Sequence, residues 1–174
     1  SISYAEASIL LDLSRYPEVF GILQRIWKAD GMTPEFSQEA LHAFLSEFVS
    51  KDLDLAPFLP IYKEFLAAYP TNFDAHLDLQ SLLYMLDKHS ERHAQLVRMT
   101  ELFPTGHPEL WNGLFQDLLS RGAYDELYKY FPLALKQYPH EGSLFLFKSL
   151  AEETSGDLEL AKRTALQGIV QADT

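Results

Sequence analysis

Three aromatic–proline dipeptides recur at nearly equal intervals along the chain, and this recurrence restricts the fold more than any other feature. The dipeptides end at Pro70 ("AAYP"), Pro104 ("ELFP") and Pro139 ("KQYP"), so the spacings are 34 and 35 residues. Periods of this length are typical of arrays of stacked helix pairs. Because a residue before proline avoids the α-helical region, each dipeptide is expected to end a helix.

Each interval carries two stripes of apolar residues at helical spacing. In the clearest interval, Gly122 separates the stripes and predicts a helix end, because glycine takes up the left-handed C-cap conformation without a clash. The first stripe contains Leu110, Trp111, Leu114, Phe115, Leu118 and Leu119, and the second contains Tyr124, Leu127, Tyr128, Phe131 and Leu135. The layout predicts an all-α domain over residues 1–174, with about five antiparallel helix pairs at 4–31, 34–70, 73–104, 107–139 and 142–172.

Local signals place several helix ends. Thr33 and Pro34 are typical of an N-cap and a first helical position, and Gly31 is expected to close a helix that opens at Pro17. Asp87 and Lys88 are expected to break the third pair. Two prolines, Pro60 and Pro132, fall inside predicted second helices and should distort them. The last helix is expected to have an apolar stripe of Leu158, Ala161, Ala165 and Ile169.

This layout resembles the tetratricopeptide (TPR) repeat over roughly residues 39–170. The family's signature positions fall at Trp111, Leu114, Gly122, Tyr124, Leu127, Phe131, Ala134 and Pro139, and in the next pair at Gly156, Leu158, Ala161 and Ala165. Phe115, Leu127 and Asp87 depart from the usual small residues or turn glycine. The sequence is also similar to the related half-a-TPR (HAT) arrays, and "FLAAYPTNFDAHLDLQSLL" to part of the TPR subunit of the RNA polymerase I core promoter factor. The resemblance implies a right-handed superhelical α-solenoid whose first helices line a concave groove.

Composition and charge exclude several classes of protein. The chain contains no cysteine, so it holds neither a disulfide framework nor a zinc–thiolate site. A net charge of −11 disfavours direct binding to nucleic acid. No apolar run is long enough to span a membrane, and the N-terminus has no signal-peptide pattern. Together these features favour an intracellular protein of the cytoplasm or nucleus.

Motifs that carry catalytic or metal chemistry are missing from the sequence. There is no nucleophile elbow and no phosphate-binding glycine-rich loop, so we expect no enzyme activity and no cofactor. His89 and His93 are spaced to share one helical face, but no third ligand follows them, and exposed positions are the better interpretation. The acids of "KDLDLA", residues 51–56, are most simply part of a turn.

The expected groove is acidic and apolar. The candidate partner-binding residues are Phe44, Glu47, Asp74, Leu77, Asp78, Ser81, Tyr84, Met85, Asn112 and Gln116. Glu47, Asp74 and Asp78 would repel a carboxylate, which excludes the clamp of Hsp70/Hsp90 co-chaperones. A partner segment that mixes basic and apolar residues fits better, with Leu77, Tyr84 and Met85 as anchors. The alternative is that the apolar residues belong to the core and the acids are merely solvated.

The sequence therefore predicts a non-catalytic scaffold that binds a protein or peptide within a larger assembly. A second hypothesis is a subunit of a nuclear transcription-initiation or RNA-processing complex, in which other subunits contact the nucleic acid. The chain begins with Ser rather than Met, and no polar capping helix follows the last helix near Ala172. We therefore expect either a longer native protein or self-association through this end.

Overall fold

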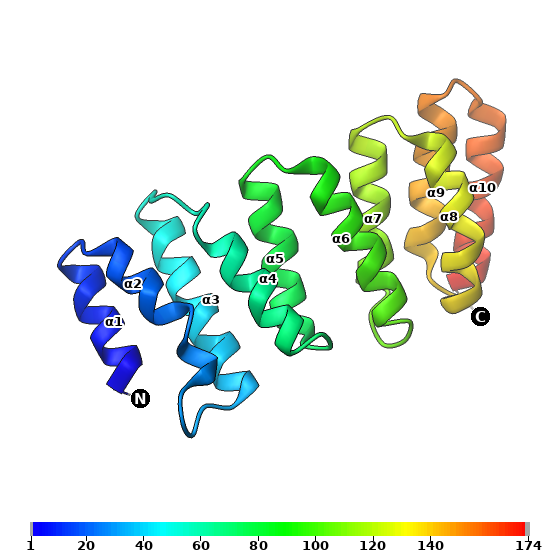
Figure 1. Ribbon diagram of the computed structural model, residues 1–174. Coiled ribbons are helices and arrows are strands. Elements are labelled where there is room, and N and C mark those ends of the chain that lie inside the picture. Colours follow the sequence, from blue (N-terminus) through cyan, green and yellow to red (C-terminus); the bar gives the residue numbers. More distant parts are fainter. Residues whose placement is uncertain (1, 173–174) are drawn as a thin grey trace. The chain divides into compact units, whose positions relative to one another are not determined.

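The structure, a computed structural model, describes residues 2–172. Within this range the chain forms ten α-helices and one 3₁₀ helix and no strand (Figure 1). The elements are α1 (Ile2–Asp12), α2 (Tyr16–Leu23), η1 (Ile26–Lys28), α3 (Pro34–Ser50), α4 (Phe58–Ala68), α5 (Phe73–Met85), α6 (His89–Leu102), α7 (Glu109–Ser120), α8 (Tyr124–Gln137), α9 (Gly142–Thr154) and α10 (Leu158–Ala172). The predicted all-α fold of about five helix pairs is confirmed.

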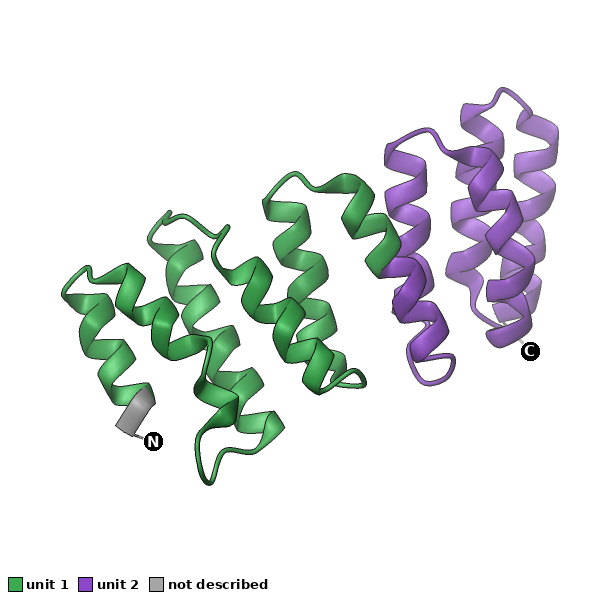
Figure 2. Ribbon diagram, viewed as in Figure 1, with its two compact units in different colours: residues 1–95 green, residues 96–174 purple. Residues whose placement is uncertain are grey.

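The helices form two compact units, shown in different colours in Figure 2. Unit 1, Ser1–Gln95, holds α1 to α5 and the start of α6, and its core contains a cluster of aromatic rings in contact. The ring centroids of Phe20, Phe48 and Phe58 lie 5.1–5.2 Å apart, mostly in edge-to-face arrangements. Unit 2, Leu96–Thr174, is built around Trp111, whose indole N–H donates to Gln137 Oε1 at 2.8 Å.

The turn within each helix pair has the same backbone geometry. After α5, the Asp87 N–H donates to Tyr84 O at 3.1 Å and the Lys88 N–H donates to Leu83 O at 2.9 Å. These two bonds define a Schellman motif, which requires a left-handed residue just past the helix. Left-handed residues with φ between 52° and 92° occur at all five turns: Ser14, Asp52, Asp87, Gly122 and Gly156. The expected break at Asp87 is confirmed, with aspartate in the place of glycine.

Helix starts agree with the local signals more closely than helix ends do. The Thr33 hydroxyl accepts the Phe36 N–H at 3.2 Å, as an N-cap should. The helix predicted to run from Pro17 to Gly31 is shorter, because Arg25 leaves the α region (φ −120°, ψ −1°) and a 3₁₀ turn follows. Pro60 lies in the first turn of α4, where no backbone donor is lost. Pro132 lies inside α8, as predicted.

The packing of α10 against α9 depends on small side chains. Ala161, Thr164 and Gly168 are the buried residues of α10. At Gly168 the helices approach so closely that a Cβ atom would lie 2.6 Å from the Cβ of Phe145. This register corrects the predicted stripe, because Leu158 and Ile169 are 64% and 61% exposed instead of buried. The small residues are buried, and the large apolar residues of α10 face outwards.

Candidate protein-binding site

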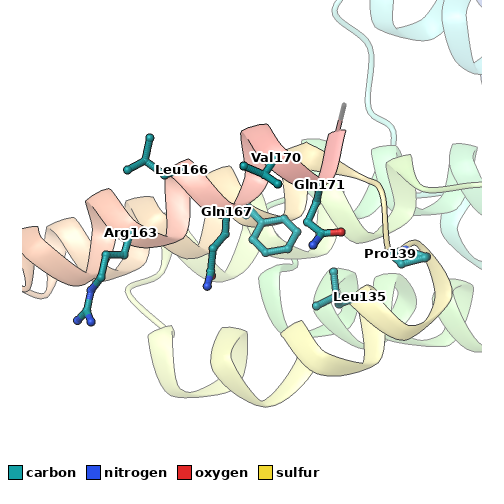
Figure 3. Close-up of a pocket in the computed structure, with 8 residues that line it drawn as sticks. Leu135, Pro139, Arg163, Leu166, Gln167, Val170 and Gln171 are labelled. Atoms are coloured by element: carbon teal, nitrogen blue, oxygen red, sulfur yellow. The ribbon is translucent and has the colours of Figure 1, made fainter. Parts of the chain in front are cut away.

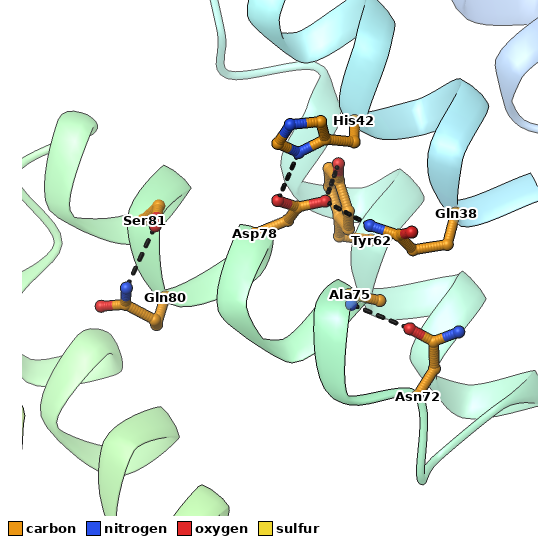
Figure 4. A network of polar contacts seen from close by, with 8 residues as sticks. All are labelled: Gln38, His42, Tyr62, Asn72, Ala75, Asp78, Gln80 and Ser81. Carbon is orange, nitrogen blue, oxygen red and sulfur yellow. Dashed lines mark hydrogen bonds and ion pairs between the residues drawn. The ribbon is translucent and has the colours of Figure 1, made fainter. Parts of the chain in front are cut away.

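Asp78 is buried at the junction of α3, α4 and α5 in unit 1. Its Oδ2 accepts hydrogen bonds from Tyr62 Oη at 2.9 Å and Gln38 Nε2 at 3.1 Å, and its Oδ1 lies 2.8 Å from His42 Nδ1 (Figure 4). Burial, followed by the charge of Asp78 and its hydrogen bond, raises the pKa of Tyr62 well above its ordinary value. Asp78, predicted as a groove residue, therefore lies in an internal network that joins three helices.

A pocket of about 270 Å³ opens between α1 and α3. Its lining residues all come from α1, from α3 and from Lys51 directly after it: Tyr4, Ser8, Leu11, Asp12, Ala43, Phe44, Glu47 and Lys51. Because no residue of α2 or α4 contributes, the pocket lies on the side formed by the first helices of the pairs. Glu47 is exposed here and pairs with Lys51 at 3.6 Å, while Asp12 forms no ion pair with a described residue.

Phe44 forms the inner wall of this pocket and is itself only 3% exposed. Its ring packs edge-on against Tyr4, with centroids 5.3 Å apart. A side chain so deeply buried offers little surface to a partner, so its contribution is to shape the pocket. Of the two residues predicted on α3, Glu47 is thus accessible and Phe44 belongs to the core.

The outward side of α5 carries a stripe of accessible residues, which we call the α5 stripe: Asp74, Leu77, Ser81, Tyr84 and Met85. Tyr84 is 62% exposed and Met85 is 41% exposed, so two large side chains are accessible to a partner at the C-terminal end of the helix. Asp74 is exposed at the other end and forms no ion pair with a described residue.

Tyr84 is held in place from one side. The guanidinium of Arg92 on α6 lies 5.0 Å from the centre of the Tyr84 ring, a cation–π arrangement. Arg92 Nε also donates to Gln80 Oε1 at 3.3 Å, and Gln80 Nε2 donates to Ser81 Oγ at 3.0 Å. These contacts restrict the Tyr84 ring before any partner binds, which lowers the entropy lost on binding.

The remaining two predicted residues lie on α7 in unit 2. Asn112 is half-buried, and its Oδ1 accepts a hydrogen bond from Ser143 Oγ of α9 at 2.8 Å. Gln116 is exposed. Asn112 therefore joins α7 to α9, whereas Gln116 is accessible to a partner.

An apolar pocket in unit 2 was missed by the sequence analysis. It has a volume of about 650 Å³ and is lined by Leu135, Pro139, Phe145, Arg163, Leu166, Gln167, Val170 and Gln171 (Figure 3). The available signal was the series Arg163, Leu166, Gln167 and Val170, which repeats at helical spacing but outside the stripe assigned to the core. Among residues 2–172, no group of three metal-ligating side chains is found and no helix is long and apolar enough to cross a membrane.

Comparison with known proteins defines the fold. No family model matches the sequence, and no curated protein does so. Solved structures do match, and with the helix pairs described above they define an all-α, TPR-like solenoid. The likeness to the RNA polymerase I factor receives no support from them.

Two of the similar structures illustrate the match. MamA MSR-1 is 19% identical, with a TM-score of 0.59 over 99% of this chain and 96% of that one. YrrB, a TPR protein with an unusual peptide-binding site, is 17% identical, with a TM-score of 0.58 over 97% of this chain and 84% of that one. At these identities the likeness concerns the fold alone.

Proposed function

We propose that this protein is a non-catalytic scaffold that binds a segment of a partner protein on the first-helix side of unit 1. The observation that carries the proposal is the exposed pair Tyr84 and Met85 on α5. Tyrosine and methionine are favoured at the centres of protein interfaces. With Leu77, they supply three apolar anchors along one side of a helix.

Acidic groups on the first helices of unit 1 favour a basic partner. Asp74 on α5 and Asp12 in the α1–α3 pocket are acidic groups without an ion pair among the described residues. Such groups attract lysine or arginine and repel acidic segments. The partner segment that fits best therefore alternates basic and apolar side chains. Asp78 and Phe44 act indirectly, since one joins the helices beneath the surface and the other shapes the pocket.

Peptide selection followed by mutation tests this proposal. Peptides selected from a random display library on the full chain should be rich in Lys or Arg beside Leu, Phe or Met. For a labelled peptide from that selection, the double variant Tyr84→Ala/Met85→Ala should raise the Kd by about tenfold or more, because each buried anchor contributes roughly 1 kcal/mol or more. Asp74→Lys should weaken binding of the same peptide, and more so at low salt.

A matched control separates loss of the site from general damage. Leu133 on α8 is an exposed apolar residue of unit 2, and Leu133→Ala should leave the Kd unchanged. Unaltered affinity in both the double variant and Asp74→Lys would refute the proposed site. The self-association predicted from the sequence concerns a different surface, the end of the last helix near Ala172, and does not depend on this site.

A further inference from the structure

The exposed side of α10 carries an unusual concentration of large apolar side chains. We call it the α10 stripe: Leu158, Lys162, Leu166, Ile169 and Val170. The four apolar members are each between 54% and 64% exposed. Contiguous apolar surface of this kind marks an interaction site when polar groups border it. The pocket of about 650 Å³ adjoins the stripe, with Leu166 and Val170 on its rim (Figure 3).

The charges bordering the α10 stripe are basic on balance, because Lys162 and Arg163 outnumber the carboxylate of Glu159 on this side of the helix. Lys162 lies within the stripe and Arg163 lines the pocket, and neither forms an ion pair with a described residue. Leu135 and Pro139 close the opposite wall of the pocket. This surface suits a helix that presents bulky apolar side chains next to a carboxylate.

The chain itself contains such a helix at the other end. Ile9 on α1 and Leu13 directly after it are 60% and 61% exposed, and the helical spacing places Glu6 on the same side. Glu6 is exposed and forms no ion pair with a described residue, although Arg25 and Lys28 line a pocket with it, and no Lys or Arg occurs within Ile2–Asp12 itself. The α1 stripe, Glu6, Ile9 and Leu13, is therefore acidic and apolar, whereas the α10 stripe is basic and apolar.

We propose that the α10 stripe of one copy binds the α1 stripe of a second copy. Ile9 and Leu13 would cover the apolar surface around Leu166 and Val170, and Glu6 would pair with Lys162 or Arg163. Because the two surfaces differ, the contact is head-to-tail, and it leaves one free stripe at each end of every oligomer. This self-association goes beyond the proposed function and uses none of the α5 stripe.

Two variants, each of which disables one of the two stripes, provide the test. Ile9→Glu disables the α1 stripe and Val170→Glu disables the α10 stripe. The two positions are 60% and 63% exposed, so the fold tolerates the change. Sedimentation of the unaltered chain from about 10 µM to about 1 mM, a range suited to small interfaces, should show a mass that rises with concentration beyond a dimer. Each variant alone should remain monomeric.

The decisive sample is the equimolar mixture of the two variants. Each supplies the stripe that the other lacks, so the mixture should form a 1:1 dimer and nothing larger. Leu133→Glu, a charge placed on an apolar residue of α8 that is half exposed, should associate like the unaltered chain. A monomeric unaltered chain at all concentrations would overturn the proposal. So would continued self-association of Ile9→Glu, because α10 would then bind a surface other than α1.

Charge reversal checks the assigned pairing in the same assay. Glu6→Lys and the double variant Lys162→Glu/Arg163→Glu should each weaken association. An equimolar mixture of the two should associate again, because it contains the native pair of Glu6 with Lys162 and Arg163 as well as the reversed pair. A mixture no stronger than either variant alone would show that these charges do not meet and would overturn the head-to-tail arrangement.

Discussion

At the residue scale, Asp78 shows how one carboxylate can differ from its neighbours in the same helix. Asp74 and Asp78 are one helical turn apart, and the sequence assigned both to the groove. The structure buries Asp78 among donors from Gln38 and Tyr62, while Asp74 is left in solvent. Sequence spacing could not distinguish them, because the donors come from residues 40 and 16 positions away.

The phenol of Tyr62 provides a prediction that depends on pH. Replacing Tyr62 by Phe removes one donor to the buried Asp78 and should lower the free energy of unfolding by about 1–2 kcal/mol at pH 8. In the folded protein the pKa of Tyr62 is raised, chiefly by burial, so the unfolded chain ionises first as the pH rises past about 10. The contribution of Tyr62 to the free energy of unfolding is thus fully present below that pH and declines above it.

Urea unfolding of both proteins at pH 8 and pH 11 measures this effect. The difference in unfolding free energy between the unaltered chain and Tyr62→Phe should shrink by roughly 1 kcal/mol between these values, following the linkage of about 1.4 kcal/mol per pH unit. Tyr62→Phe retains every other tyrosine, so the ionisation of those tyrosines cancels in the difference between the two proteins. An equal difference at both pH values would contradict the burial of an un-ionised Tyr62.

At the element scale, the turn within each helix pair is more regular than its sequence. Glycine occupies the left-handed position at Gly122 and Gly156, but serine or aspartate occupies it at Ser14, Asp52 and Asp87. The repeat period and the helix pairs were predictable, because apolar spacing and the aromatic–proline dipeptides at the helix ends specify them locally. The sequence did not reveal that all five turns share one hydrogen-bonding pattern, since two residue types besides glycine tolerate it.

This regularity predicts a stabilising substitution. Asp87→Gly should raise the free energy of unfolding by about 0.5–1 kcal/mol, because glycine avoids the cost of a Cβ atom at φ 59°. The exposed contact of Asp87 with His89 contributes little against this gain. Asp87→Ala is the matched control and should destabilise the protein in the same urea titration. A loss of stability with glycine would show that the turn does not depend on the left-handed residue.

The side of α10 that is buried was predicted incorrectly, because the sequence does not show how closely two helices approach. Apolar spacing alone gave a stripe through Leu158 and Ile169, but close packing on α9 requires small residues. Gly168 against Phe145 sets the distance between the helices, so the large side chains point away from it. A sequence pattern records which residues are apolar and does not record which of two possible stripes permits the closer approach.

At the scale of the whole molecule, the chain offers two separate accessible surfaces. The α5 stripe in unit 1 contains five of the predicted residues, including all three anchors, whereas the surface around α10 in unit 2 contains none. The first could be anticipated because its residues lie on one side of a single predicted helix. The second also depends on Leu135, Pro139 and Phe145, which only the folded chain brings to α10.

The central claim is that a partner segment binds on the first-helix side of unit 1, and a hydrogen-exchange footprint of the bound peptide tests it most directly. With a peptide from the library selection bound at saturation, amide protection should increase mainly in residues 73–88 and around the α1–α3 pocket. The Tyr84→Ala/Met85→Ala variant, exposed to the same peptide concentration, should lose this protection. Protection confined to α8–α10, or protection that persists in the double variant, would contradict the account.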